Sequence, residues 1–232
     1  MNFSKFPRTP HLFLLPGVQV RDDKIMSAEE VVHFLADPVT VEEKVDGANI
    51  GLSFNESGQL KIQNRGGYIE PGFSEQFNPL WDWAYQRLSV LQEHVGKKYI
   101  LFGEWCYVKH SIHYTQLPDY FIGFDMYDKQ SGTFLNTHDR NHFFDQMNIA
   151  RVPQIGRKRY QLNELTEMLS SVLSSFYNGP MEGIYLRNEN DNRLISRAKL
   201  VRREFVDQIS EHWSKKRMVK NLLYSNTIYT KP

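Results

Sequence analysis

The chain has 232 residues, of which 41% are hydrophobic, and this is enough apolar surface to build a sizeable core in one large or two small domains. Its 28 basic and 27 acidic side chains leave a net charge of +1, which excludes binding of nucleic acid through a globally basic surface. The single Cys106 excludes an internal disulfide framework, and the short apolar run at 11–15 is stopped by Pro16. We therefore expect a cytoplasmic protein without a membrane span.

Apolar periodicity, capping residues and turn signals predict an α+β fold with antiparallel sheets and peripheral helices. The predicted elements, in chain order, are a short helix from Ser27 to near Pro38, strands at 39–41 and from residue 50, a hairpin turn at 55–58, a helix from Asn78 to Leu91, strands at 99–108, 120–128 and 132–135, helices over 137–148 and 163–174, a hairpin turn at 188–192 and a last helix over 204–222. The chain shows no repeats and no low-complexity linker, so we expect a single domain over residues 1–232.

The segment Glu43–Asn49, with the sequence EKVDGAN, places Lys44 at a turn between two predicted strands, where its amine can face a cleft. The tetrapeptide Lys44–Gly47 is a weak signal when taken alone, because Asp-Gly is an ordinary turn and most lysines are simply solvated. It gains weight from four segments that lie C-terminal to it.

Each of these four segments carries polar or aromatic residues on an apolar strand pattern. One carboxylate beside a glycine occurs in 99–105 and again in 181–187, where the acids are Glu104 and Glu182. Between them, the strand at 120–127 presents Phe124, which is either a stacking surface for a base or an ordinary core aromatic. In 196–202, Arg197 and Lys199 share one strand face because side chains alternate with a period of two.

This ordered set, from Val41 to Arg202, resembles the covalent nucleotidyltransferases, which are the ATP-dependent RNA and DNA ligases and the mRNA capping enzymes. Glu43 before the lysine and Asn49 after it resemble the RNA ligase version, of the phage RNA ligase 2 and editing-ligase type. Gln63–Gly66 resembles the arginine motif that comes next in the family. The sequence departs from the pattern at Arg197, where the family usually has a first lysine. Arginine keeps the positive charge but not the compact geometry of an ammonium.

The resemblance implies a ligase adenylation domain, with an ATP-grasp-like arrangement, that joins RNA 5′-phosphate and 3′-hydroxyl ends in RNA repair. Its cofactors are ATP, whose AMP becomes covalently attached to Lys44, and Mg²⁺ or Mn²⁺. The implied catalytic residues are Lys44, Asp46, Glu182 and Lys199, and the implied metal ligands are Asp46, Glu104 and Glu182. The implied nucleotide-binding residues are Glu43, Lys44, Asn49, Arg65, Glu104, Phe124, Glu182, Arg197 and Lys199.

The lysine amine must be unprotonated to attack a phosphate, whereas a free lysine has a pKa of ~10.4. We expect Lys199, Arg197 and a bound metal to lower the pKa of Lys44 by making its ammonium form costly. Glu182 and Glu104 sit on apolar strands, where an ionised carboxylate requires a partner.

Several alternatives stay open at this point. Cys106, His110 and His113 do not follow a strong zinc spacing, so a supporting role is favoured over a metal site. The basic cluster at 215–217, with Lys220, is read either as a phosphate-binding track or as a solvated helix face.

Only 33 residues come after Lys199 (232 − 199), so we expect no oligonucleotide-binding barrel, which favours a minimal RNA ligase over a capping enzyme or a complete DNA ligase. A minimal DNA ligase, another polynucleotide adenylyltransferase and a non-catalytic nucleotide-binding module are the alternative functions. We expect a monomer that acts on RNA, with an end-processing kinase or phosphatase as a possible partner.

Overall fold

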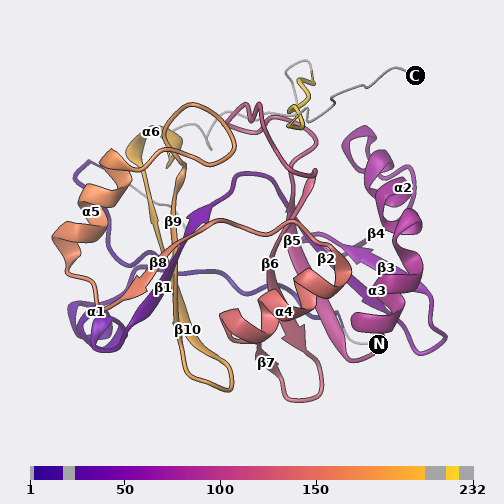
Figure 1. The fold of residues 1–232 in the computed structure, drawn as a ribbon, viewed down its shortest axis with the longest axis horizontal. Coiled ribbons are helices and arrows are strands. Elements are labelled where there is room, and N and C mark those ends of the chain that lie inside the picture. Colours follow the sequence, from indigo (N-terminus) through magenta and orange to yellow (C-terminus); the bar gives the residue numbers. More distant parts are fainter. Residues whose placement is uncertain (1–2, 18–23, 207–217, 225–232) are drawn as a thin grey trace, which may run out of the picture.

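The computed structural model describes residues 3–17, 24–206 and 218–224, and it contains two antiparallel sheets that stand next to each other (Figure 1). The four-stranded sheet has the order β10-β9-β1-β8, and the six-stranded sheet has the order β4-β3-β2-β5-β6-β7. The strands of the first sheet are β1 (Val39–Lys44), β8 (Gln154–Lys158), β9 (Gly183–Glu189) and β10 (Leu194–Val201). Those of the second are β2 (Ala48–Phe54), β3 (Leu60–Gln63), β4 (Tyr68–Ile69), β5 (Tyr99–Trp105), β6 (Phe121–Asp128) and β7 (Thr133–Phe134).

The connection between β1 and β2 joins the two sheets. β1 ends at Lys44 in the four-stranded sheet, and β2 begins at Ala48 in the six-stranded sheet. The predicted turn at the lysine is therefore confirmed, although its two strands do not pair with each other. The Lys44–Gly47 segment lies where the sheets meet, so side chains from both sheets can converge there on one ligand.

Helices cover the outer faces of both sheets. α1 (Ala28–Leu35) and α5 (Leu162–Ser171) flank the four-stranded sheet, whereas α2 (Asn78–Gln86) and α3 (Leu88–His94) flank the other (Figure 1). α4 (Thr137–Met147) follows β7, and two short helices, η1 (Glu75–Phe77) and α6 (Arg203–Val206), complete the described elements. Each sheet has its own apolar core against its helices. Within the described ranges, no helix combines the length and the apolar character that a membrane span requires.

The α+β class, the antiparallel sheets and most predicted elements are confirmed. The capping box at Ser27 is present: its hydroxyl accepts from the Glu30 backbone N–H, and the Glu30 carboxylate accepts from the Ser27 backbone N–H. The hairpins at 55–58 and 188–192 also form, because Phe54 pairs with Leu60 and β9 pairs with β10.

Some boundaries were wrong. The helix predicted from Asn78 to Leu91 is broken at Arg87, whose guanidinium lies over the Trp83 ring and bonds Asp119. The strand over 99–108 ends at Trp105, and the helix over 163–174 ends at Ser171. The short β4 and the polar edge strand β8 were missed, because neither shows a clear alternation. Of the helix predicted over 204–222, residues 204–206 lie in α6, and 218–222 are not helical. Residues 207–217, which include the basic cluster at 215–217, lie outside the described residues.

Candidate active site

A cavity of about 440 Å³ lies where the two sheets meet. Pockets that bind small molecules typically range from about 300 to 1,000 Å³, so this one is of the size of a nucleotide site. Eight of the ten residues predicted for the site line it: Glu43, Lys44, Asn49, Arg65, Glu104, Phe124, Glu182 and Lys199. The structure thus gathers residues that are spread over more than 150 positions of sequence.

Strand register brings Lys44 and Glu182 together. Lys44 is the last residue of β1 and pairs with Gly183 of β9, so Glu182 stands beside it. The Lys44 Nζ donates to both carboxylate oxygens of Glu182, at 2.6 and 2.5 Å. Gly183 is needed for this arrangement, because a Cβ there would come within 2.3 Å of the Leu200 carbonyl oxygen.

The pKa of Lys44 is raised, and our expectation that neighbouring cations lower it is wrong for the protein without ligands. Burial by itself lowers this pKa, but the adjacent Glu182 carboxylate, with smaller contributions from Asp46 and Glu104, outweighs burial. The pKa of Glu182 is raised to about 7, because burial disfavours its charge and Lys44 offsets that only in part. Lys44 is therefore an ammonium held by a carboxylate, and its proton must leave before it can act as a nucleophile.

Glu104 and Asn49 both line the cavity, and each has one unsatisfied polar atom. The two residues face each other across β2 and β5. Glu104 Oε2 and Asn49 Nδ2 are buried and make no hydrogen bond among the described residues. Burial raises the pKa of Glu104 to about 8, although the charges of Lys44 and Arg65 act in the opposite direction. Because buried polar atoms are normally satisfied, these two atoms leave hydrogen-bonding capacity beside the cavity for a bound ligand or an ordered water.

Other predicted residues occupy different walls. Lys199 on β10 pairs with Tyr185 of β9, and its charge also acts on Glu182. Arg65 lies in the turn after β3, where the Asn64 side chain accepts from the N–H groups of the following glycines. Phe124 on β6 is half-buried and meets the edge of the Phe6 ring, so one wall is aromatic.

Glu43 lies on a wall of the cavity, but its carboxylate is already engaged. It accepts from the Ser174 hydroxyl at 2.5 Å and from the Ser175 N–H at 2.9 Å. Burial raises the pKa of Glu43, and these bonds offset the rise in part. Glu43 therefore ties the loop after α5 to the end of β1.

The structure does not bring Asp46 and Arg197 to the cavity wall. Asp46 Oδ2 accepts from the Ser111 N–H at 2.7 Å, the Ser111 hydroxyl at 2.5 Å and the Ile112 N–H at 3.1 Å. Arg197 bonds Asp125 at 3.2 Å and lies 3.9 Å over the Phe134 ring. Asp46 thus fixes a loop beside Lys44, whereas Arg197 belongs to a charged network with Asp125.

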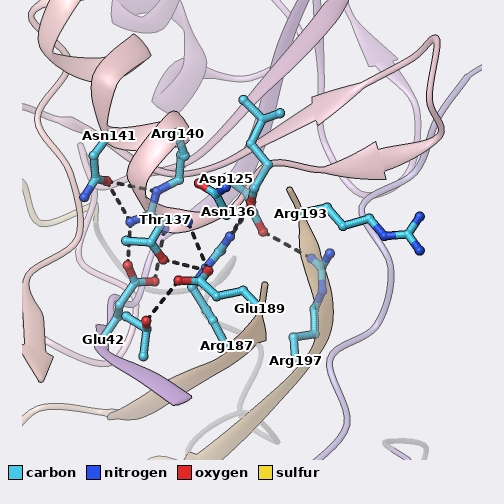
Figure 2. A network of polar contacts seen from close by, with 12 residues as sticks. Glu42, Asp125, Asn136, Thr137, Arg140, Asn141, Arg187, Glu189, Arg193 and Arg197 are labelled. Atoms are coloured by element: carbon cyan, nitrogen blue, oxygen red, sulfur yellow. Dashed lines mark hydrogen bonds and ion pairs between the residues drawn. The ribbon is translucent and has the colours of Figure 1, made fainter. Parts of the chain in front are cut away.

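Figure 2 shows this network, which joins the two sheets through buried ion pairs. Arg140 of α4 makes a bidentate pair with Glu42 of β1, at 2.6 and 3.2 Å, and both side chains are only 1% exposed. Arg187 of β9 reaches one oxygen of Asp125 of β6 at 2.8 Å, and Arg197 reaches the other. The network therefore links the two sheets through ion pairs that are almost completely buried.

Sequence reasoning missed the N-terminal wall of the cavity. Phe6, Arg8, Thr9 and His11 line it, although nothing in their sequence pattern marks them. The segment lies along β10, because the Lys199 N–H donates to the Pro10 carbonyl and the Leu12 N–H donates to the Lys199 carbonyl. Tyr185 and Val201 were also missed, but their alternation with known site residues on β9 and β10 is a signal that points to them.

Among the described residues, no group of three histidine, cysteine, aspartate or glutamate side chains is close enough to hold a metal by itself. This finding gives no support to a zinc site at Cys106, His110 and His113. Glu104 and Glu182, the two acids on the cavity wall besides the β1 glutamates, fit Mg²⁺ or Mn²⁺, because such hard cations prefer oxygen and usually keep several waters.

The sequence model of the RNA ligase family matches residues 37–201, which include every predicted site residue. The chain belongs to the RNA ligase family. A search of curated protein sequences gives no significant match.

Solved structures agree with the fold of this RNA ligase family member. Naegleria gruberi RNA ligase with pyrophosphate matches at a TM-score of 0.61 and 16% identity, covering 90% of this chain and 63% of that one. An archaeal ATP-dependent RNA ligase matches at a TM-score of 0.56 and 16% identity, covering 85% of this chain and 48% of that one. A protein from Aquifex aeolicus, described as a putative ATP-dependent DNA ligase, matches at a TM-score of 0.56 and 21% identity. The match covers 86% of this chain and 50% of that one. The chain thus spans less than two thirds of the length of each.

Proposed function

We propose that this protein is an ATP-dependent RNA ligase that joins a 5′-phosphate to a 3′-hydroxyl through a lysyl-AMP intermediate. The observation that carries the proposal is Lys44, which lies in a nucleotide-sized cavity within hydrogen-bond distance of Glu182 and beside Glu104, Arg65 and Lys199. The family match over residues 37–201 supports the same reaction class.

The chain's own residues account for the handling of ATP. The Lys44 amine attacks the α-phosphorus, the bond to pyrophosphate breaks, and AMP remains on Nζ as a phosphoramidate. Lys199 stabilises the charge that develops on the phosphate oxygens, since preorganised cations are the main contribution a protein makes to such transfers. Phe124 stacks on adenine, Glu43 lies near the base, and Arg65 serves the ribose or a substrate phosphate. The Asn49 side-chain N–H donates to a phosphate oxygen, and the Glu104 carboxylate accepts from a ribose hydroxyl.

A divalent cation fits the acids of the site, and Glu104 and Glu182 would hold it, in part through water. When bound, it supplies positive charge that favours the neutral amine of Lys44 and stabilises the phosphate oxygens. Variants of the Naegleria ligase have been solved with AMP or ATP and manganese, which supports this pair of cofactors. Glu182 is the residue that must release the Lys44 ammonium when the site fills.

RNA is the proposed substrate because Glu43 and Asn49 flank the nucleophile as in RNA ligases and because the family match is to RNA ligases. In the remaining steps, AMP passes to the RNA 5′-phosphate, and the 3′-hydroxyl then displaces AMP. A DNA ligase is the second candidate, favoured by the similarity to the Aquifex protein.

The test is incubation with each labelled NTP and Mg²⁺ or Mn²⁺, followed by denaturing electrophoresis and peptide mass spectrometry. ATP should label the wild type at Lys44, and Lys44→Ala should take no label. Lys61→Ala is the matched control, because Lys61 lies on β3 away from the cavity wall and should leave labelling unchanged. A label that maps to another residue, or that requires GTP, would contradict the proposal.

A further inference from the structure

Residues 218–224, here called the C-terminal strap, lie against the long loop between β5 and β6. The strap makes backbone hydrogen bonds at both of its ends: the Lys109 N–H donates to the Val219 carbonyl at 2.8 Å, and the Tyr224 N–H donates to the Leu117 carbonyl at 2.7 Å. Further bonds join Leu222 to Tyr114 and to Leu117. The loop therefore has a partner that lies more than 100 positions away in sequence.

Asn221 is the centre of this contact. It is fully buried, with 0% of its surface exposed. Its side-chain N–H donates to the Cys106 carbonyl at 2.8 Å, and its side-chain oxygen accepts from the Tyr114 N–H at 2.9 Å. Its backbone N–H donates to the Tyr107 carbonyl at 3.1 Å, and its carbonyl accepts from the Tyr120 hydroxyl at 3.2 Å. One amide side chain thus bridges two ends of the loop, using both a donor and an acceptor.

Hydrogen bonds continue from Asn221 to the nucleophile motif. The Tyr114 hydroxyl accepts from the Asp46 backbone N–H at 2.9 Å. The same loop also supplies the Ser111 and Ile112 donors that hold the Asp46 carboxylate. Asp46 is two residues from Lys44, in the segment that crosses between the sheets. Asn221 therefore holds the loop that in turn holds this crossing segment.

We propose that Asn221 is a positioning residue: it fixes the loop at 106–117 and, through Tyr114 and Asp46, sets the direction in which Lys44 enters the cavity. Asn221 lies outside the stretch matched by the family model, which ends at residue 201. The proposal rests on the proposed function only for its kinetic consequence, since the fixing of the loop is a property of the folded chain. Small misplacements of reacting groups can cost about 10²-fold in rate, so this contact is expected to affect chemistry more than nucleotide binding.

The first experiment measures amide hydrogen exchange in the whole chain. Asn221→Ala should speed exchange of Ile112 and Tyr114 at least tenfold and leave the core of β9 unchanged. Leu222→Ala is the matched control, because its side chain is 52% exposed and its contacts with the loop are made by the backbone. If Asn221→Ala and Leu222→Ala give the same exchange, the proposal is overturned. Should Asn221→Ala fail to fold, Asn221→Asp keeps the shape and the acceptor while removing the donor to Cys106.

The second experiment measures lysyl-AMP formation in single turnover. Asn221→Ala should lower the maximal rate about 10- to 100-fold with ATP affinity changed less than twofold. Tyr114→Phe removes the hydroxyl that binds the Asp46 backbone N–H. The double variant, Asn221→Ala with Tyr114→Phe, should form lysyl-AMP no more slowly than the slower of the two single variants, because both substitutions act through the same contact. Multiplied effects would overturn the route through Tyr114. A wild type that takes no label overturns the proposed function instead, and the exchange experiment still decides the role of Asn221.

Discussion

Lys44 Nζ lies 2.6 and 2.5 Å from the two carboxylate oxygens of Glu182, the residue that directly precedes its strand partner Gly183. The pair is formed by strand register, so Lys44 and Glu182 are held together in the absence of any ligand. Without ligands, the Glu182 carboxylate stabilises Lys44 in its protonated, ammonium form. In the proposed reaction, another cation would take the place of the Lys44 ammonium beside Glu182.

The first prediction concerns the protonation of Lys44. Because the Glu182 carboxylate raises the pKa of Lys44 against the effect of burial, Glu182→Gln should lower that pKa and make the amine reactive at lower pH. Trace labelling with an acylating reagent from pH 7 to 11, read by mass spectrometry of the Lys44 peptide, measures this without ATP. The same substitution should greatly reduce adenylation, because the metal loses a ligand. An unchanged labelling profile would show that Glu182 does not control the proton.

The second prediction concerns Glu104 and stability. Its folded pKa is about 8, above an ordinary value of 4.5, so between these pH values the folded state binds more protons than the unfolded state and stability falls as pH rises. Glu104→Gln should therefore raise the melting temperature by several degrees at pH 8 and change it little at pH 5. For a chain of this size, each kcal/mol of stability shifts the melting temperature by about 2–4 °C. The exposed Glu93→Gln is the control. Equal shifts at both pH values would contradict the raised pKa.

The third prediction concerns the network between the sheets. Glu42→Gln or Arg140→Met leaves a buried charge without its partner and should lower the free energy of unfolding by about 3–5 kcal/mol. The double variant Glu42→Met with Arg140→Met should be less destabilised than the sum of the single ones. Lys158→Met breaks an exposed pair with Glu164 and should cost about 0–1 kcal/mol. Denaturant unfolding measures the free energy of unfolding of all these variants. A small loss of this free energy in Arg140→Met would show that the network does not stabilise the packing of the two sheets.

The fourth prediction concerns the substrate. Nicked duplexes that differ only in ribose or deoxyribose at the terminal nucleotides on the 3′-hydroxyl side should be sealed faster with ribose, because the 2′-hydroxyl distinguishes RNA locally. With a net charge of only +1, binding should rest on a small basic surface and weaken steeply with salt. Sealing of an all-DNA nick at an equal or higher rate would contradict RNA specificity and leave the lysyl-AMP chemistry standing.

Motif order and strand patterns were sufficient to find eight of the cavity residues. An acid beside a glycine on an apolar strand, as at Glu182, can be recognised without coordinates because burial of an ionised group requires a partner. Local sequence also determined the capping box of α1 and the two hairpin turns, since these depend on residues close together in the chain.

Two of the predicted site residues, Arg197 and Asp46, make contacts that depend on residues far away in the sequence. Arg197 shares a strand face with Lys199, and it pairs with the buried carboxylate of Asp125 on another strand. Asp46 stands two residues from the nucleophile, yet the donors of Ser111 and Ile112 use its carboxylate to fix a loop. A period of two predicts which face a side chain occupies, and it does not predict which charge lies opposite.

The sequence by itself determined the class of the fold and eight of the residues that line the cavity, because each has a local pattern tied to its chemistry. Only the tertiary structure decided that Lys44 is held as an ammonium by Glu182, that residues 6–11 wall the cavity, and that Asn221 supports the loop behind it. These features arise from strand pairing across two sheets and from burial, which set distances between residues far apart in the chain. Such distances, and the pKa values that depend on them, are properties of the folded chain alone.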